Sequence, residues 1–282
     1  MKKDESASFK QSTVLPWIEM RVANQSRACY EAHSHDEFSF GMIEQGSAEY
    51  RNRHKIHRIG NGDMVTINPG DVHSCNPDKG TWSYNMLFVD AKELGDVQRD
   101  VLQQTCLDYV PFNADVSENP LTFSRFQSLL NALGDESSRL QAQACVYDFV
   151  ESCWGVVPTY GRNNFESVDP GIGRIKEKLL DEIDNAHQLE DLAKEAGMSR
   201  YQLLRAFKNE YGLPPYAFLI DERIKRAKVM LKTGQTISDV ALQLGFSDQA
   251  HFQRHFKKKL AVTPRYYQSH FENPLQKNPI GK

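Results

Sequence analysis

The residues best suited to chemistry in this sequence are histidines and a carboxylate near its start. His33, His35 and Glu37 alternate along a short stretch, and His73 follows a Pro69-Gly70 turn. Side chains two residues apart share one face of a strand, so we expect the first three groups to lie together, with His73 near them. Three imidazoles and one carboxylate form an adequate ligand set for a divalent metal.

These residues belong to two stretches that resemble the motifs of the cupin barrel, HSHDE (33–37) and GDMVTINPGDVH (62–73). A metal-binding cupin normally carries a carboxylate four residues beyond the second histidine, where this chain has Ser39. We therefore expect no metal and no other cofactor, although His33, His35 and His73 are the candidate ligands if a metal binds. The resemblance implies a barrel whose histidines hydrogen-bond within the fold or to a small-molecule effector. The candidate effector-binding residues are His33, His35, Glu37, His73, Trp82 and Tyr84.

A second pattern is an internal repeat of about 48 residues near the C-terminus. Each copy predicts a short helix, a turn led by Gly197 or Gly245, and a second helix, which is a helix-turn-helix. Glycine is favoured in such turns because it adopts a left-handed backbone at little cost. Ser199 and Gln202 form a capping box that predicts where the second helix of the first copy begins. The expected helices span residues 189–196, 199–211, 237–244 and 247–260.

The second helix of each copy has a buried face and a free face when its residues are placed 100° apart. Leu203 and Phe207 face inward in the first copy, and Phe252 and Phe256 do so in the second. The opposite faces mix arginine, lysine, glutamine and tyrosine. Because arginine and glutamine pair bidentately with base edges and lysine meets phosphate, these faces suit the major groove of DNA.

The run ISDVALQLGFSDQAHFQRHFKKKLAVTPRYY (237–267) closely resembles the signature of AraC/XylS-type transcription regulators, and LEDLAKEAGMSRYQLLRAFKNEYG (189–212) resembles their first helix-turn-helix. The resemblance covers about 172–269, and its one departure is Ala261, where the family usually has glycine and where we expect some strain. It implies base contacts by Arg200, Tyr201, Leu204, Arg205, Gln249, Ala250, His251 and Arg254. The free faces add Lys208, Gln253 and Lys257 as DNA-binding candidates.

A single helix is predicted between the two copies, over residues 215–232. At ~1.5 Å per residue its length is roughly 27 Å. Successive major-groove faces of B-DNA are ~34 Å apart, so one chain could place both recognition helices on the same side of a duplex.

The chain as a whole predicts an α+β fold of two domains. A cupin-like β-barrel (1–90) is followed by a helical region (91–154) that either covers the barrel or forms a dimerisation surface. Turn-forming residues predict a linker (155–173), and an all-α domain with two helix-turn-helix units and a linker helix (174–270) precedes a C-terminal tail (271–282).

Charge is distributed unevenly between these parts. The chain holds 34 Lys+Arg against 37 Asp+Glu, a net charge of -3. Residues 1–168 hold 15 against 23, giving -8, and residues 169–282 hold 19 against 14, giving +5. Only the second part has the sign of a polyanion binder. The five scattered cysteines, without a CxxC spacing, fit reduced thiols, and the short apolar runs predict a cytoplasmic protein with no membrane partner.

The leading hypothesis is therefore a transcription regulator that is not an enzyme. Its expected partners are promoter DNA, a small-molecule effector, RNA polymerase and a second copy of the chain. The alternative is a metal-dependent cupin enzyme that carries a DNA-binding domain. A nonspecific architectural DNA protein is disfavoured, because the acidic first part would oppose sequence-independent phosphate binding.

Overall fold

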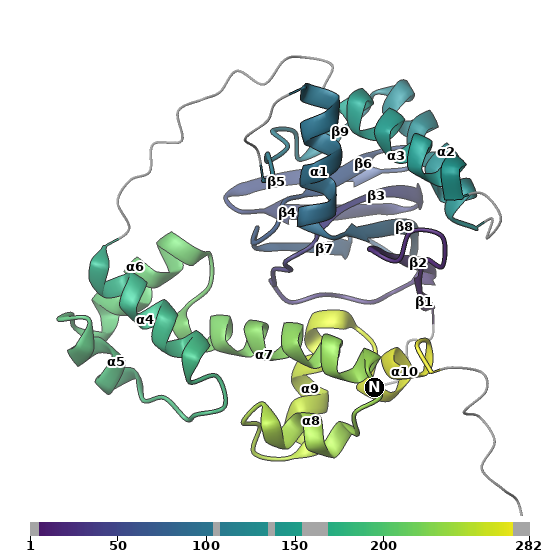
Figure 1. Cartoon of the computed structure of the whole chain (residues 1–282). Helices are drawn as coiled ribbons and strands as arrows, with labels where there is room; N and C mark the ends of the chain where they lie inside the picture. Colours follow the sequence, from purple (N-terminus) through teal and green to yellow (C-terminus); the bar gives the residue numbers. More distant parts are fainter. Residues whose placement is uncertain (1–5, 104–107, 135–138, 154–168, 273–282) are drawn as a thin grey trace, which may run out of the picture. The chain divides into compact units, whose positions relative to one another are not determined.

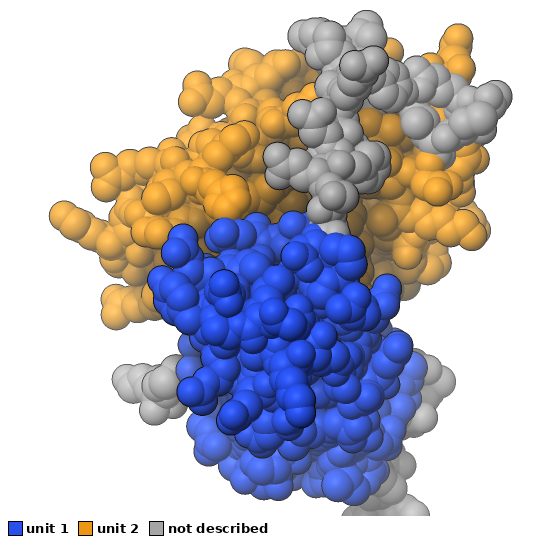
Figure 2. Space-filling view, turned by 90° about the vertical axis from the view of Figure 1, so that its left-hand side faces the viewer, with its two compact units in different colours: residues 1–3, 30–34, 162–282 blue, residues 4–29, 35–161 orange. Residues whose placement is uncertain are grey.

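The computed structural model describes residues 6–103, 108–134, 139–153 and 169–272. Within these ranges the chain forms two compact units, one built from 6–29 and 35–153 and the other from 30–34 and 169–272; Figure 2 colours them separately. Most of the predicted linker, most of the predicted tail and Cys106 lie outside the described residues. Every helix of the described ranges is too short or too polar to cross a bilayer.

The first unit contains two antiparallel sheets (Figure 1). The larger sheet has the strand order β1-β2-β8-β3-β6-β9, and the smaller has the order β5-β4-β7. The strands are β1 (Ala7–Gln11), β2 (Ile18–Ser26), β3 (Phe38–Gln45), β4 (Ser47–Asn52), β5 (Lys55–Gly60), β6 (Met64–Ile67), β7 (His73–Pro77), β8 (Trp82–Val89) and β9 (Val116–Ser117). The tight turns between them use glycine with positive φ at Gly46, Gly62, Gly70 and Gly80. The sheets confirm the predicted β-rich first domain.

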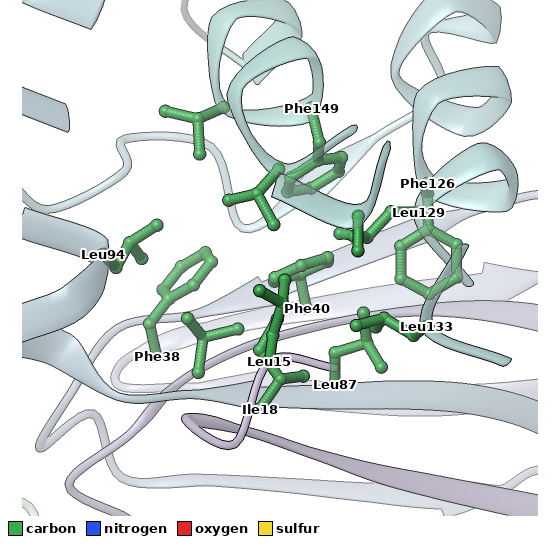
Figure 3. Packing of buried hydrophobic residues seen from close by; sticks show 14 of the residues in the cluster. Leu15, Ile18, Phe38, Phe40, Leu87, Leu94, Phe126, Leu129, Leu133 and Phe149 are labelled. Carbon is green, nitrogen blue, oxygen red and sulfur yellow. The ribbon is translucent and has the colours of Figure 1, made fainter. Parts of the chain in front are cut away.

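The large sheet is covered on one face by α1 (Ala91–Leu102), α2 (Pro120–Gly134) and α3 (Arg139–Cys153). Figure 3 shows Phe126 of α2 and Phe149 of α3 packed over Phe40 of β3, with Phe149 stacked on Phe40 at a centroid distance of 4.1 Å. Strand β3 is buried on both faces over Phe38–Ile43, because these helices cover one face and the small sheet covers the other. The second face of the large sheet therefore lines the interior between the two sheets.

The second unit is helical and contains the predicted repeat. Its helices are α4 (Pro170–Asp181), α5 (Leu189–Glu195), α6 (Arg200–Tyr211), α7 (Pro215–Lys232), α8 (Ile237–Gln243), α9 (Gln249–Leu260) and α10 (Pro264–Ser269). The bounds of α7 are those expected for the linker helix, and α5-α6 and α8-α9 are the two helix-turn-helix units. The α+β fold with two domains is confirmed.

Side chains fix the starts of these helices as the sequence indicates. Ser199 Oγ accepts from Gln202 N, and Gln202 Oε1 accepts from Ser199 N at 2.9 Å, completing the capping box of α6. Thr236 Oγ accepts from Asp239 N at 3.1 Å at the start of α8. Asp169 caps α4, whose first residue is Pro170, so the last four residues of the predicted linker already belong to this helix.

One expectation about the first unit is wrong in detail. No strand alternates His33, His35 and Glu37 onto one face, because β3 begins only at Phe38. The backbone before β3 bonds elsewhere: His35 O accepts from Gly70 N at 2.9 Å, and Ser34 N donates to a side chain of the second unit. The predicted helical region (91–154) contains α1, α2 and α3, as expected.

The turn glycines of the two helix-turn-helix units provide a matched pair of substitutions. Gly197 and Gly245 both have positive φ, 69° and 67°. A Cβ at Gly197 would meet nothing within 4 Å, whereas a Cβ at Gly245 would overlap the carbonyl oxygen of Asp184. We expect Gly197→Ala to lower the free energy of unfolding by about 1–2 kcal/mol through backbone strain. Gly245→Ala should cost about 1 kcal/mol or more beyond that through the overlap. Urea unfolding of both variants measures the difference, and equal losses would contradict the steric part.

Candidate DNA-binding and effector sites

The free face of α6 is exposed as predicted from its periodicity. Leu203 and Phe207 are fully buried, while Arg200, Tyr201, Arg205 and Lys208 are exposed and Leu204 is half-buried. The guanidinium of Arg205 lies 5.7 Å from the centre of the Tyr201 ring, an arrangement that holds the arginine head along the helix. The Arg205 guanidinium and the Tyr201 phenol therefore lie side by side on the exposed face of α6.

The corresponding face of α9 is also accessible. Phe252 and Phe256 are fully buried. The predicted contact residues are all exposed or half-buried, and they are Gln249, Ala250, His251, Gln253, Arg254 and Lys257. Asp248 caps the helix by accepting from His251 N at 2.6 Å, and this backbone hydrogen bond lowers the pKa of the Asp248 carboxyl. The start of α9 is tied to α8, because Ser238 Oγ donates to Gln249 Oε1 at 2.8 Å.

A histidine pair lies on the flank of this α9 face. His251 and His255 are one turn apart, with their Nε2 atoms 3.0 Å from each other. Burial, followed by the nearby His251, lowers the pKa of His255 to about 4. His255 is therefore neutral near pH 7, and one ring of the pair donates while the other accepts. The hydrogen bond to His251 therefore stabilises α9, and the neutral His255 adds no positive charge to the helix.

The interior of the first unit contains a buried arginine that the sequence did not single out. Ile18 and Met20 of β2 join the helix-covered core, so Arg21 points to the opposite face of the sheet. Its guanidinium lies 5.1 Å from the centre of the Phe9 ring and 5.8 Å from that of Tyr84. The alternation of β2 could have indicated the burial of Arg21, because the sheet buries Glu19, Arg21 and Ala23 on one face.

Tyr84, a predicted effector contact, lies at this arginine, and Trp82, a second predicted contact, packs against Tyr84. Both are buried, and their ring centres are 4.3 Å apart. Among the described residues, Trp82 Nε1 has no hydrogen-bond acceptor, and Asn52 Oδ1 on β4 has no hydrogen-bond donor. Buried polar atoms are normally satisfied, so these two mark places where a ligand or water would bind.

His35 and His73 come together as expected. Their ring centres are 4.8 Å apart, and His35 lies edge-on to Phe88 at 5.3 Å. His35 Nε2 and Ser39 Oγ are hydrogen-bonded at 3.1 Å, so Ser39 occupies the position of the missing cupin carboxylate as a partner of the ring. His35 Nδ1 and the Glu37 carbonyl oxygen are 2.7 Å apart. The pair is thus held by hydrogen bonds within the fold.

The other two candidates lie differently. His33 belongs to the second unit, where its Nδ1 is 2.8 Å from the Glu31 carbonyl oxygen, and Glu37 is half-buried in the loop before β3. The expected convergence of three imidazoles is therefore not seen. In the part of the chain that the structure describes, no three histidine, cysteine or carboxylate side chains gather in a way that could hold a metal ion.

A buried carboxylate cluster between β4 and β5 is a further feature that sequence reasoning missed. Asp115 accepts from Asn52 Nδ2 at 3.0 Å and lies 2.9 Å from Lys55 Nζ and 3.2 Å from His57 Nε2. Burial would raise the pKa of Asp115, but the hydrogen bonds from Lys55 and His57 lower it overall. The cluster joins the segment before β9 to the small sheet, and we interpret it as structural because Asn52, Lys55 and His57 all bond to Asp115.

Family comparisons agree with both units. Residues 18–150 match the AraC-like ligand binding domain, and residues 192–270 match a helix-turn-helix domain. The chain belongs to the AraC family of transcription regulators. As an AraC-type regulator it pairs a ligand-binding N-terminal domain with a DNA-binding C-terminal domain, which confirms the resemblance seen in its motifs.

Individual relatives of this AraC-type regulator are also transcription regulators. It is 28% identical over 224 residues to the HTH-type transcriptional regulator YbfI of Bacillus subtilis (strain 168), covering 78% of this chain and 80% of that protein. It is 34% identical over 100 residues to the HTH-type transcriptional regulator MtrA of Neisseria gonorrhoeae, covering 35% of this chain and 33% of that protein. The fold resembles that of ToxT from Vibrio cholerae O395, with a TM-score of 0.57 at 14% identity over 91% of this chain and 99% of that one.

Proposed function

We propose that this AraC-type regulator reads promoter DNA with α6 and α9 and changes its activity when a small carboxylic acid binds inside the first unit. It acts as a regulator rather than an enzyme, in the cytoplasm, with RNA polymerase as its partner at the promoter. The observation that carries the DNA-binding half is the duplicated helix-turn-helix with two accessible faces rich in Arg, Lys, Gln and Tyr.

The effector half rests on the buried Arg21 and its surroundings. A guanidinium between the rings of Phe9 and Tyr84 suits a carboxylate, because charge-assisted bonds to arginine are strong where water is excluded. The Trp82 Nε1–H supplies a further donor, and the surrounding aromatic rings suit the apolar part of such a molecule. One ToxT structure holds an unsaturated fatty acid, which is also a carboxylic acid.

A homodimer is also proposed, through α2 and α3. Leu121 and Leu140 are 53% and 81% exposed on these helices, and Tyr147 is 38% exposed. Exposed apolar side chains on neighbouring helices are typical of association surfaces. This supports the helical region as a dimerisation surface in addition to its cover over the large sheet.

Matched pairs of acid and alcohol test the effector site, using octanoate with 1-octanol and 4-phenylbutanoate with 4-phenylbutanol. We expect at least one acid to raise the melting temperature of the full chain more than its alcohol, since a ligand of the native state stabilises by mass action. The Arg21→Met variant should weaken the binding of that acid about tenfold or more through the lost charged bond. Trp fluorescence reports the melt.

Arg58→Met is the control, because Arg58 is an exposed residue of β5 that pairs with Asp78. It should bind the acid as the unmodified chain does. Equal stabilisation by acid and alcohol, or binding unchanged by Arg21→Met, would reject a carboxylate held by Arg21.

A further inference from the structure

The second unit contains a buried ion pair outside its DNA-binding faces. Asp221 of α7 and Lys259 of α9 are 2% and 5% exposed, and Lys259 Nζ lies 3.3 Å from Asp221 Oδ1. Removing two charges from water is costly, and their mutual attraction compensates only when further hydrogen bonds satisfy the remaining atoms. The partners of this pair therefore decide whether α9 is held firmly on α7.

Those partners come from residues 30–34, nearly 190 residues earlier in the chain. Ser34 donates twice to Asp221 Oδ2, from its backbone nitrogen at 2.9 Å and from its hydroxyl at 2.8 Å. Lys259 Nζ donates to the carbonyl oxygen of Ala32. The short segment thus completes the hydrogen bonding of both buried charges.

The same segment bonds to the last turn of α9 at two more points. Glu31 N donates to the carbonyl oxygen of Lys258 at 3.0 Å, and the Glu31 carboxylate lies 2.9 Å from Lys258 Nζ. A helix end leaves its last carbonyl groups without partners inside the helix, so the first of these bonds satisfies one of them. Residues 30–34 behave as part of the helical unit to which they are assigned.

The position of the contact on α9 indicates its role. Nine residues separate Ala250 from Lys259, and at about 100° per residue the two side chains point about 180° apart. Ala250 lies on the exposed face, whereas Lys259 is buried. The segment therefore binds the back of α9 and leaves the predicted DNA-contacting face open.

We propose that residues 30–34 form a strap that positions α9 for reading DNA, with Ser34, Asp221 and Lys259 as its positioning residues. The inference rests on the proposed reading of DNA by α9. With the strap in place α9 is held in one orientation on α7; without it the binding-competent orientation is less populated and the apparent affinity falls by that fraction. Because these hydrogen bonds and ion pairs of the strap go to α7 and α9, we expect the loss to be confined to the bases read by α9.

The test uses the full chain and a duplex that the full chain selects from a random pool. Each base pair is replaced in turn, and the loss of affinity is measured for each variant and for the unmodified chain. Base pairs at which this loss is smaller for Arg205→Ala define the half-site of α6. Base pairs at which it is smaller for Arg254→Ala define the half-site of α9. Discrimination at each half-site is then measured for Ser34→Ala, Asp221→Asn and Lys259→Met. Lys178→Met removes the same charge from a solvent-accessible pair between Lys178 of α4 and Glu195 of α5 and serves as the control.

We expect the three strap variants to reduce discrimination at the α9 half-site by about two- to 160-fold, the range found for coupled residues of one network, and to leave the α6 half-site unchanged. The double variant Ser34→Ala/Asp221→Ala should be no worse than Asp221→Ala alone, because alanine at position 221 already removes the acceptor of the Ser34 hydroxyl. Ser34→Ala removes a single hydroxyl and keeps the test valid if the charge variants unfold. Equal losses at both half-sites, no loss, or additive losses overturn the strap. If Arg254→Ala itself changes no base preference, the proposed DNA contact of α9 fails, which is a different result.

Discussion

Replacing Arg223 by methionine is expected to lower the free energy of unfolding of the helical unit by about 4–5 kcal/mol, because three backbone carbonyl groups lose their donor together. Arg223 of α7 is 4% exposed. Its guanidinium donates to the carbonyl oxygens of Ile183 at 2.7 Å, Gly245 at 2.8 Å and Asn185 at 2.9 Å. The first and third follow α4 and the second is the turn glycine of the second repeat, so this one side chain joins the two halves of the unit.

Two probes measure the Arg223→Met effect. Trp17 and Trp82 lie in the first unit, and residues 169–282 contain no tryptophan, so the fluorescence of these two residues follows the first unit. Far-UV circular dichroism includes the helices of the second unit. We expect urea unfolding of Arg223→Met to show an early loss of helical signal at unchanged tryptophan fluorescence. A loss of this size is a large fraction of the stability of an ordinary domain.

Arg226→Met on the same helix is the control for Arg223→Met. Arg226 is exposed and, among the residues that the structure describes, donates to Leu180 O alone, at 3.0 Å, so its loss should cost less than about 1 kcal/mol. Arg223→Lys should recover only a minor part of the stability, because an ammonium cannot reproduce the planar fork that reaches three carbonyls. Equal effects of Arg223→Met and Arg226→Met would show that the three bonds add nothing to stability.

The helical unit was predictable almost to the residue because its signals are local. Repeated apolar positions, turn glycines and capping residues each act within one or two turns, and they fixed α6, α7 and α9. Ala261 confirms the expected strain, since it ends α9 with φ of 62° where glycine would be unstrained. What the periodicity did not reveal is that Arg223 and Asp221, in the middle of α7, bond to distant backbone and to residues 30–34.

The first unit was predictable in class and less so in detail. Strand β4 alternates between turn residues, and β3 and β6 are buried runs between turn residues, whereas β1 is a strand with polar residues at the sheet edge that pairs with β2. The histidine motif predicted a strand at 33–37, but long-range bonds to Ser34 and His35 decided that backbone instead. Arg21 was missed because its importance comes from Phe9 and Tyr84 on neighbouring strands, and pairing between strands is not a local property.

Replacing both Arg205 and Arg254 by alanine is expected to weaken binding to the selected duplex by about 2–6 kcal/mol, or roughly 30-fold to 10⁴-fold. Each arginine is exposed on a different recognition helix, and a guanidinium that pairs bidentately with guanine contributes about 1–3 kcal/mol. Because the two side chains share no partner, the losses should add. Fluorescence anisotropy at one fixed salt concentration measures the affinities.

Arg174→Ala is the matched control for the arginine variants, since Arg174 is an exposed residue of α4 outside both recognition helices.

A phosphate contact and a base contact can be distinguished by how the affinity depends on DNA sequence and on salt concentration. Loss of a phosphate contact, as expected for Lys208→Ala, weakens binding to all duplexes alike and reduces the salt slope by about 1. Loss of a base contact lowers the affinity for the selected duplex and removes its preference over duplexes changed at one half-site. The net charge of +5 over residues 169–282 is modest, so unspecific attraction should be weak and the base contacts should dominate. Unchanged affinity of the Arg205→Ala/Arg254→Ala chain would therefore place DNA recognition on some other surface than α6 and α9.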